Sequence, residues 1–161
     1  MSHASTDTDT RNDIEILNRS LSGEYFGIAA YQAAMGTGLL EDEVHAVAEQ
    51  FQGDHRQHAQ HIQKAITELG GNPIETKTWE QFASEFPPPP LETQADVLRY
   101  AASLEESGAI ASVASVAKLA SPELSLLAAS IAGVEAMHWS VLLGALGENP
   151  VPVSFIPSPT E

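Results

Sequence analysis

Apolar side chains recur every three or four positions along most of this 161-residue chain. Such spacing places apolar residues on one face of an α-helix. Proline disrupts helix interiors, and the ten prolines fall between these stretches, after them or at their start. Ser121-Pro122-Glu123 is typical of a helix N-terminus, with an N-cap, a first-turn proline and an acid. We expect residues 1–11 to form a disordered N-terminal tail and residues 151–161 to form an extended C-terminal tail. The pattern predicts four helices, at residues 12–36, 40–69, 92–119 and 122–146.

The connection between the second and third predicted helices, residues 70–91, is too long for a simple turn between neighbouring antiparallel helices. At ~3.3 Å per residue it can run the whole length of a ~25-residue helix. We therefore expect an all-α, antiparallel four-helix bundle over residues 12–150, in which one long crossover joins helices 2 and 3. Within the crossover, Thr78-Trp-Glu-Gln81 matches a capping box and predicts a short helix near 78–85.

Six ionisable side chains interrupt the apolar rows near the middles of these helices. Taken singly, a glutamate in such a row is usually partly exposed or paired, and a histidine is usually a neutral core residue. Burying an unpaired carboxylate is costly, however, and the chain has only 7 Lys and Arg to pair with 22 Asp and Glu. On the third predicted helix, either of two adjacent acids fits the pattern, so the choice between them stays open. The residues are Glu24, His55, His58, Glu105 or Glu106, Glu135 and His138.

These six positions lie at comparable heights in an antiparallel bundle. Di-metal carboxylate bundles place one Glu on each of two helices and a Glu-x-x-His motif on each of the other two, and Glu135 with His138 has that spacing. Carboxylate and imidazole ligands suit Fe or Mn, with Zn as an alternative. The sequence therefore predicts a metal site in the bundle core. A polar core without metal is the alternative.

Two helices carry similar sequences, which indicates an internal repeat. Each has a large apolar residue, a glycine two positions before the first polar core residue, and a histidine three positions after it. The helix ends also match, but their spacing from the histidines differs by three residues. The pattern therefore supports two copies of a helix hairpin without establishing duplication. The matching segments are Phe51-Gln-Gly-Asp-His55-Arg-Gln-His58 with Ile131-Ala-Gly-Val-Glu135-Ala-Met-His138, and Leu69-Gly-Gly-Asn-Pro73 with Leu146-Gly-Glu-Asn-Pro150.

The net charge of −15 disfavours binding to nucleic acid, which depends on Lys and Arg at the phosphates, and it disfavours anionic membranes likewise. Absence of cysteine excludes disulfides, Fe–S clusters, Cys-ligated zinc and thiolate nucleophiles. No uncharged stretch reaches the roughly 20 residues of a membrane span. Because the first ten residues have neither the basic nor the apolar region of a signal peptide, we expect a cytoplasmic protein.

The order and spacing of several motifs resemble those of ferritin-like domain proteins, in the branch that includes desiccation-related proteins. The resemblance covers about residues 12–155. It implies a ferritin-like bundle in which Glu24 and Glu105 are metal ligands, Glu135 bridges two metals, and His58 and His138 are terminal ligands. The motifs are Asp13-Ile-Glu-Ile-Leu-Asn18 before Glu24 and Tyr31, His58-Ala59 before Leu69-Gly-Gly-Asn-Pro73, Leu104-Glu105 with Gly108, Val134-Glu135-Ala-Met-His138, and Leu146-Gly-Glu-Asn-Pro150 with Phe155.

The chain departs from the family pattern at position 55, where the pattern has a second Glu and this sequence has His55. Three carboxylates and three imidazoles imply either one ion or two ions of unequal affinity. Asp54 is an alternative replacement, although its side chain is shorter and its direction lies about 100° from that of His55. Ser112 replaces a tyrosine that the pattern often carries seven residues after Glu105, which removes a phenol from the site.

The resemblance implies a protein that binds an Fe or Mn pair and handles iron or reactive oxygen, with O₂ or peroxide as partner. The alternative is a non-enzymatic, stress-associated or structural protein that holds one ion or none. A homodimer is the default assembly. We interpret the small residues of the third helix as a surface for close helix packing, and a small-molecule pocket is the competing interpretation. These residues are Ala109, Ala111, Ser112, Ala114 and Ser115.

Overall fold

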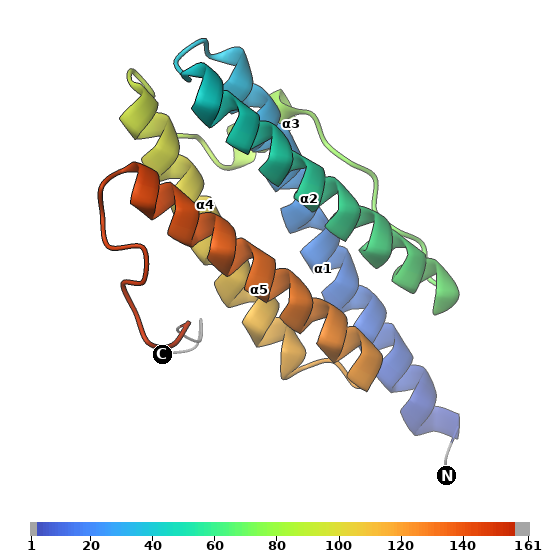
Figure 1. Cartoon of the computed structure of the whole chain (residues 1–161). Coiled ribbons are helices and arrows are strands. Elements are labelled where there is room, and N and C mark those ends of the chain that lie inside the picture. The colour runs from blue at the N-terminus through green and yellow to red at the C-terminus, as the bar shows by residue number, and fades with distance from the viewer. Residues whose placement is uncertain (1–2, 157–161) are drawn as a thin grey trace.

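A computed structural model describes residues 3–156, which contain five helices and no strand (Figure 1). Four long helices form an antiparallel bundle of two hairpins, α1 with α2 and α4 with α5, and a crossover carrying the short α3 joins the hairpins. The predicted fold class and the single crossover are confirmed. The helices are α1 (His3–Gly36), α2 (Asp42–Glu68), α3 (Trp79–Glu85), α4 (Gln94–Val116) and α5 (Pro122–Ala145).

Three of the helices begin at side-chain caps that their sequences encode. Thr78 and Thr93 each form a complete capping box with the residue three positions further on. The Ser121 hydroxyl accepts a hydrogen bond from the backbone N–H of Leu124. Each cap satisfies an N–H group that has no partner within its helix. The predicted short helix in the crossover and the predicted start of the last helix are therefore both present.

The repeated helix ends prove to be matching C-terminal caps. Gly70 and Gly147 have φ values of 78° and 73°, in the left-handed region where a side chain would be strained. In both caps the N–H of the next residue donates to the carbonyl five residues back, at 2.9 Å. This bond characterises the Schellman motif, so the repeat at the helix ends has a local structural cause.

The first helix differs from the prediction at its start. The sequence predicted a disordered tail over residues 1–11, and in the structure α1 begins at His3; residues 1–2 lie outside the described part. No glycine or proline lies between residues 3 and 11 to end the helix. The Arg11 side chain also donates to the Asp7 carbonyl, at 3.1 Å. At the other end of the chain, residues 151–156 form no helix.

Two apolar clusters fill the bundle, one on each side of its polar middle. One cluster includes Leu21, Ile62 and Ile66, whose side chains are almost fully buried. The other is built around Phe51 and Trp139. The buried Glu and His residues lie between these clusters along each helix, so the clusters flank them with apolar side chains.

By length and composition alone, α5 could also cross a membrane. In this structure one face of α5 packs inside the bundle, and Glu135 and His138 are buried on that face.

The small residues of α4 have two different surroundings. Ala109 is fully buried, as the interpretation of close packing requires. The other four line a groove between α1 and α4, where they do not pack closely against α1, although Ser112 also contacts Glu135 of α5. These residues are Ala111, Ser112, Ala114 and Ser115. Their short side chains do not reach across to α1, where the facing positions are also small, including Gly27 and Ala30.

Aromatic contacts fix the crossover against α1 beside this groove. The Phe26 ring on α1 stacks on Trp79 at 6.1 Å between centroids and meets Phe82 edge-on at 5.3 Å. The Asn18 side chain adds hydrogen bonds to the crossover backbone at Asn72 and Ile74. The long connection is therefore held to the bundle by specific contacts.

Asp13 connects the start of the bundle to the turn between α4 and α5. Its carboxylate is 3% exposed and accepts hydrogen bonds from the backbone N–H groups of Ala120, at 2.8 Å, and Ser121, at 3.3 Å. Replacing Asp13 with Ala would leave both N–H groups without this acceptor. An unsatisfied buried donor costs about 1–3 kcal/mol.

We expect Asp13→Ala to lower the free energy of unfolding by about 2 kcal/mol, measured by urea denaturation. The exposed Asp9 on the same helix gives a matched control, because Asp9→Ala should change stability by less than about 0.5 kcal/mol. Equal effects of the two substitutions would contradict a specific role for the Asp13 bridge.

Candidate metal centre

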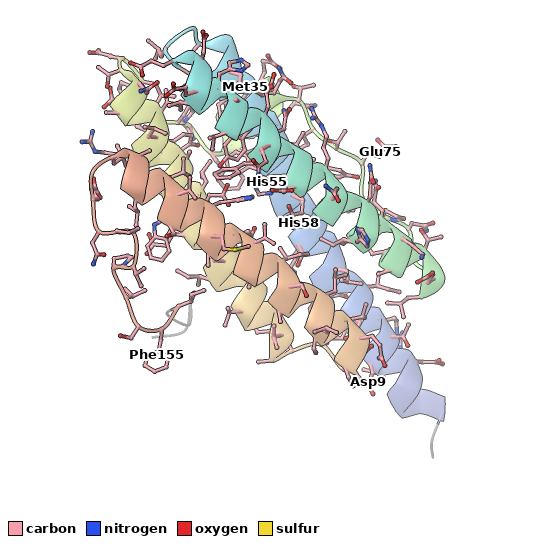
Figure 2. All side chains as sticks on the ribbon, in the orientation of Figure 1. Asp9, Met35, His55, His58, Glu75 and Phe155 are labelled. Atoms are coloured by element: carbon pink, nitrogen blue, oxygen red, sulfur yellow. The ribbon has the colours of Figure 1, made fainter. Side chains whose placement is uncertain are left out.

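The four long helices bring six ionisable side chains together in the polar middle of the bundle. Glu24 comes from α1, two histidines from α2, Glu105 from α4, and Glu135 with His138 from α5. Two groups of three could each hold an ion, because their ligand atoms lie within 4.8 Å of one another: Glu24, His55 and His58, and His55, Glu105 and His138. Figure 2 labels His55 and His58 where α2 faces the interior.

His55 belongs to both groups and joins two carboxylates. Its Nδ1 lies 2.7 Å from Glu24 Oε2, and its Nε2 lies 3.3 Å from Glu105 Oε1. An imidazolium can donate from both nitrogens at once. Burial alone would lower the pKa of His55, but hydrogen bonds and charge from Glu105 and Glu24 raise it to about 10. In the protein without metal, a charged His55 therefore sits between Glu24 and Glu105.

The same contacts keep two of the carboxylates ionised. Burial would raise the pKa of Glu105, but the imidazoles of His138 and His55 lower it to about 2. Burial also opposes ionisation of Glu24, and His55 and His58 outweigh that effect and lower its pKa. The positive charge for these buried acids comes from histidine, as no described Lys or Arg forms an ion pair with either.

His58 has a buried nitrogen with unmet bonding capacity. Its Nδ1 lies 3.4 Å from Glu24 Oε2 and has no hydrogen-bond partner among the described residues. Unsatisfied buried polar atoms are rare in folded proteins. A cation beside Glu24 would give this nitrogen a partner, so this donor set fits a metal ion.

His138 is held from three sides. Its Nδ1 lies 3.3 Å from Glu105 Oε2, and its Nε2 lies 3.1 Å from Asp54 Oδ2. Its ring stacks on Phe51, with 3.7 Å between centroids. A histidine that binds metal through one nitrogen commonly donates from the other to a carboxylate. Asp54 is placed for that role.

These contacts answer two questions that the sequence left open. His55 occupies the interior position on α2, while Asp54 contacts His138 at the edge of the cluster. On α4, Glu105 is the interior acid at 3% exposure, and Glu106 is half-buried with no described contact to the cluster. The cluster therefore contains His55 and Glu105.

Glu135 sits apart from the two groups of three and contacts α4. Its Oε2 accepts a hydrogen bond from Ser112 at 2.9 Å. A Cβ added at Gly108 would lie 2.5 Å from its Oε1, so a larger residue there would displace this carboxylate from its present position. Burial and the charge of Glu24 raise the pKa of Glu135 to about 8. Glu135 is therefore mostly protonated at neutral pH when no metal is present.

Two side chains form hydrogen bonds to the cluster carboxylates that the sequence did not predict. The Tyr31 hydroxyl donates to Glu105 Oε1 at 2.5 Å, and burial together with the Glu105 charge raises the pKa of this phenol. In the sequence, Tyr31 was part of a motif of the family resemblance and had no assigned role. Ser112 was expected only to remove a phenol, yet its hydroxyl supplies a hydrogen bond to Glu135. Its position seven residues after Glu105, on the same helix face, was the available signal.

The fold and the cluster together define a four-helix bundle with a carboxylate and histidine core. The model of the family described as "ferritin-like domain" matches residues 12–148, and the chain belongs to this family. No curated protein matches.

Two solved structures show the same fold. One is a conserved hypothetical protein from Mycobacterium tuberculosis, with a TM-score of 0.76 and 20% identity. The other is a ferritin-like, diiron-carboxylate protein from Bacillus anthracis strain Ames, with a TM-score of 0.70 and 24% identity. Each comparison covers 91% of this chain and 99% of the other.

The raised pKa of Glu135 predicts a pH dependence of stability. Without metal, the folded protein keeps a proton on Glu135 up to about pH 8, whereas the unfolded chain loses it near 4.5. Unfolding therefore releases a proton between these values, and stability must fall as pH rises. We expect a slope of at most about 1.4 kcal/mol per pH unit from this group. Glu135→Gln should flatten the profile in chelator-treated protein, measured by urea unfolding from pH 5 to 8.

The exposed Glu43 on α2 provides the control for that experiment. Glu43→Gln should leave the slope unchanged. An unaltered slope in Glu135→Gln would show that Glu135 is ionised in the folded protein.

Proposed function

We propose that this chain is a cytoplasmic metal-binding protein of the ferritin-like family, whose core cluster binds Fe or Mn and oxidises iron or removes reactive oxygen species. The observation that carries the proposal is the donor set: three buried carboxylates, three imidazoles, and a His58 nitrogen with no hydrogen-bond partner among the described residues. Oxygen and imidazole ligands suit Fe and Mn. The diiron-carboxylate description of the Bacillus anthracis protein supports this proposal.

The cluster favours one firmly held ion. A neutral imidazole has a single unprotonated nitrogen, so His55 can ligate an ion in only one of the two groups it joins. The residues proposed to hold metal are Glu24, His55, His58, Glu105, Glu135 and His138. A bound ion would supply one-electron redox chemistry toward O₂ or peroxide.

The surrounding residues have separate roles. Tyr31 fixes the orientation of Glu105 by donating to Oε1. Asp54 accepts from His138 Nε2 and leaves Nδ1 directed toward Glu105. Ser112 holds Glu135 against α4. The apolar clusters flank these groups at both ends of the site and lower the local dielectric there, which strengthens each electrostatic contact.

The second candidate is a structural, stress-associated bundle without metal chemistry. The bridge that His55 makes between Glu24 and Glu105 favours it, because an imidazolium there already supplies positive charge. In that case chelator should leave the thermal midpoint unchanged. A bound ion at 100 times its Kd would instead add about 2.7 kcal/mol of stability.

Metal loading tests the proposal directly. Chelator-treated protein loaded anaerobically with Fe(II), or with Mn(II) in a parallel sample, should retain metal after desalting, measured by mass spectrometry. Fe(II)-loaded protein should then consume O₂. Glu135→Ala should weaken metal affinity at least tenfold, since even groups that only orient ligands cost 10- to 100-fold. Absence of metal uptake, or unchanged uptake in Glu135→Ala, would exclude the proposal.

A further substitution tests the orientation of His138. We expect Asp54→Ala to weaken metal affinity about tenfold, because His138 Nε2 loses its acceptor. The exposed Asp42 at the start of α2 is the control, and Asp42→Ala should bind metal normally. Titration calorimetry with Mn(II) measures both variants. Equal affinity of the Asp54 and Asp42 variants would show that His138 is oriented without Asp54.

A further inference from the structure

The groove between α1 and α4 has a cavity volume of about 620 Å³ and reaches the bundle core. It is bounded by residues 16–37, on α1 and its C-terminal end, and by residues 97–118, on the antiparallel α4 and its C-terminal end. Its length is about 32 Å at 1.5 Å per residue. Ligand sites commonly have volumes of roughly 300–1,000 Å³ and mainly apolar walls. This groove has both properties.

Small residues make the walls of the groove and aromatic residues partly cover it. Ala30 and Ala34 lie on the α1 side, and Ala111 and Ala114 lie on the α4 side. Phe26, Trp79, Pro88 and Leu91 contribute from α1 and the crossover. The floor is formed by the polar cluster, at Glu24, His55, Glu105 and Glu135.

We propose that this groove binds one long-chain fatty acid, with the alkyl chain along the small-residue walls and the carboxylate at the end marked by Arg19 and Lys118.

The dimensions of the groove favour an alkyl chain. Its volume of about 620 Å³ extends along about 32 Å, so the groove is long and narrow. An α-helix with side chains is about 10–12 Å wide and does not fit. An extended peptide would place backbone N–H and C=O groups against apolar walls without partners, which is costly. A single unbranched hydrocarbon chain has no such groups.

The distribution of charge determines which end of the groove holds the carboxylate of the fatty acid. Only seven Lys and Arg occur in the chain, and two of them, Arg19 and Lys118, lie at the same end of the groove. A hydrogen bond from Asn12 to the Lys118 carbonyl, at 3.2 Å, holds that end together. Lys118 has no ion pair within the described residues, and Arg19 makes only an exposed pair with Glu15. The carboxylates of the floor repel an anionic group, so the acid group lies at the cationic end.

Binding depends on the groove and not on a bound ion, so it can be tested on chelator-treated protein. Metal binding and fatty-acid binding then fail independently. Titration calorimetry with hexadecanoate below its micelle concentration should give one site per chain. Dissociation constants for tetradecanoate and dodecanoate should rise by about two- to fourfold for each methylene removed, as expected for apolar burial.

Filling the groove should block binding. The double variant Ala30→Leu/Ala114→Leu keeps good helix-forming residues and places larger side chains in the open space. We expect it to weaken hexadecanoate at least tenfold. Ala46→Leu, on the exposed side of α2, is the matched control and should bind normally. Circular dichroism checks that both variants fold, and the chain-length series stands without either.

Two comparisons of head groups test whether the carboxylate lies at the end of the groove with Arg19 and Lys118. Arg19→Gln/Lys118→Gln should weaken tetradecanoate several-fold and leave tetradecanol unchanged, whereas Lys64→Gln, in an exposed pair on α2, should affect neither. Three results would overturn the proposal: no saturable binding, equal binding by the groove-filling variant, or no dependence on chain length. If the protein is a dimer and the groove-filling substitutions dissociate it, a second copy of the chain occupies the groove. That result would also overturn the proposal.

Discussion

Burial of three carboxylates in an apolar bundle is the constraint on which the rest of this structure depends. Ionised carboxylates are stable there only with a compensating positive charge. The structure supplies it through imidazoles and places His55 between Glu24 and Glu105. The remaining acid, Glu135, has no such contact in the protein without metal, and its raised pKa keeps it protonated. A cation in the cluster would let all three acids ionise together.

This arrangement affects the packing of all four helices. The polar layer divides the core into two apolar clusters, so each hairpin is joined to the other above and below a charged centre. Asp13 and Asn18 then fix the ends and the crossover by hydrogen bonds to backbone N–H groups. Apolar clusters therefore stabilise the bundle on both sides of the polar centre.

The sequence predicted the helices, the crossover and the six residues of the polar centre, because apolar periodicity and capping motifs are local signals. Apolar periodicity alone could not choose between Glu105 and Glu106, since each acid lies in an apolar row of α4 and the choice depends on what lies opposite; the family resemblance favoured Glu105. The role of Asp54 was also hidden, because its partner His138 is far away in the chain. The start of α1 was misplaced because the polar segment before residue 12 has no apolar pattern.

The small residues of α4 connect the centre to the groove. Gly108 leaves open the space that the Glu135 carboxylate occupies, where a Cβ would meet it. One turn further along, Ser112 donates to the same carboxylate, and Ala111 and Ser115 face α1. Larger side chains on this face would either displace Glu135 or fill the groove. A single stretch of small residues therefore does two things: Gly108 and Ser112 admit the buried carboxylate from α5, and Ala111 and Ser115 leave open space toward α1.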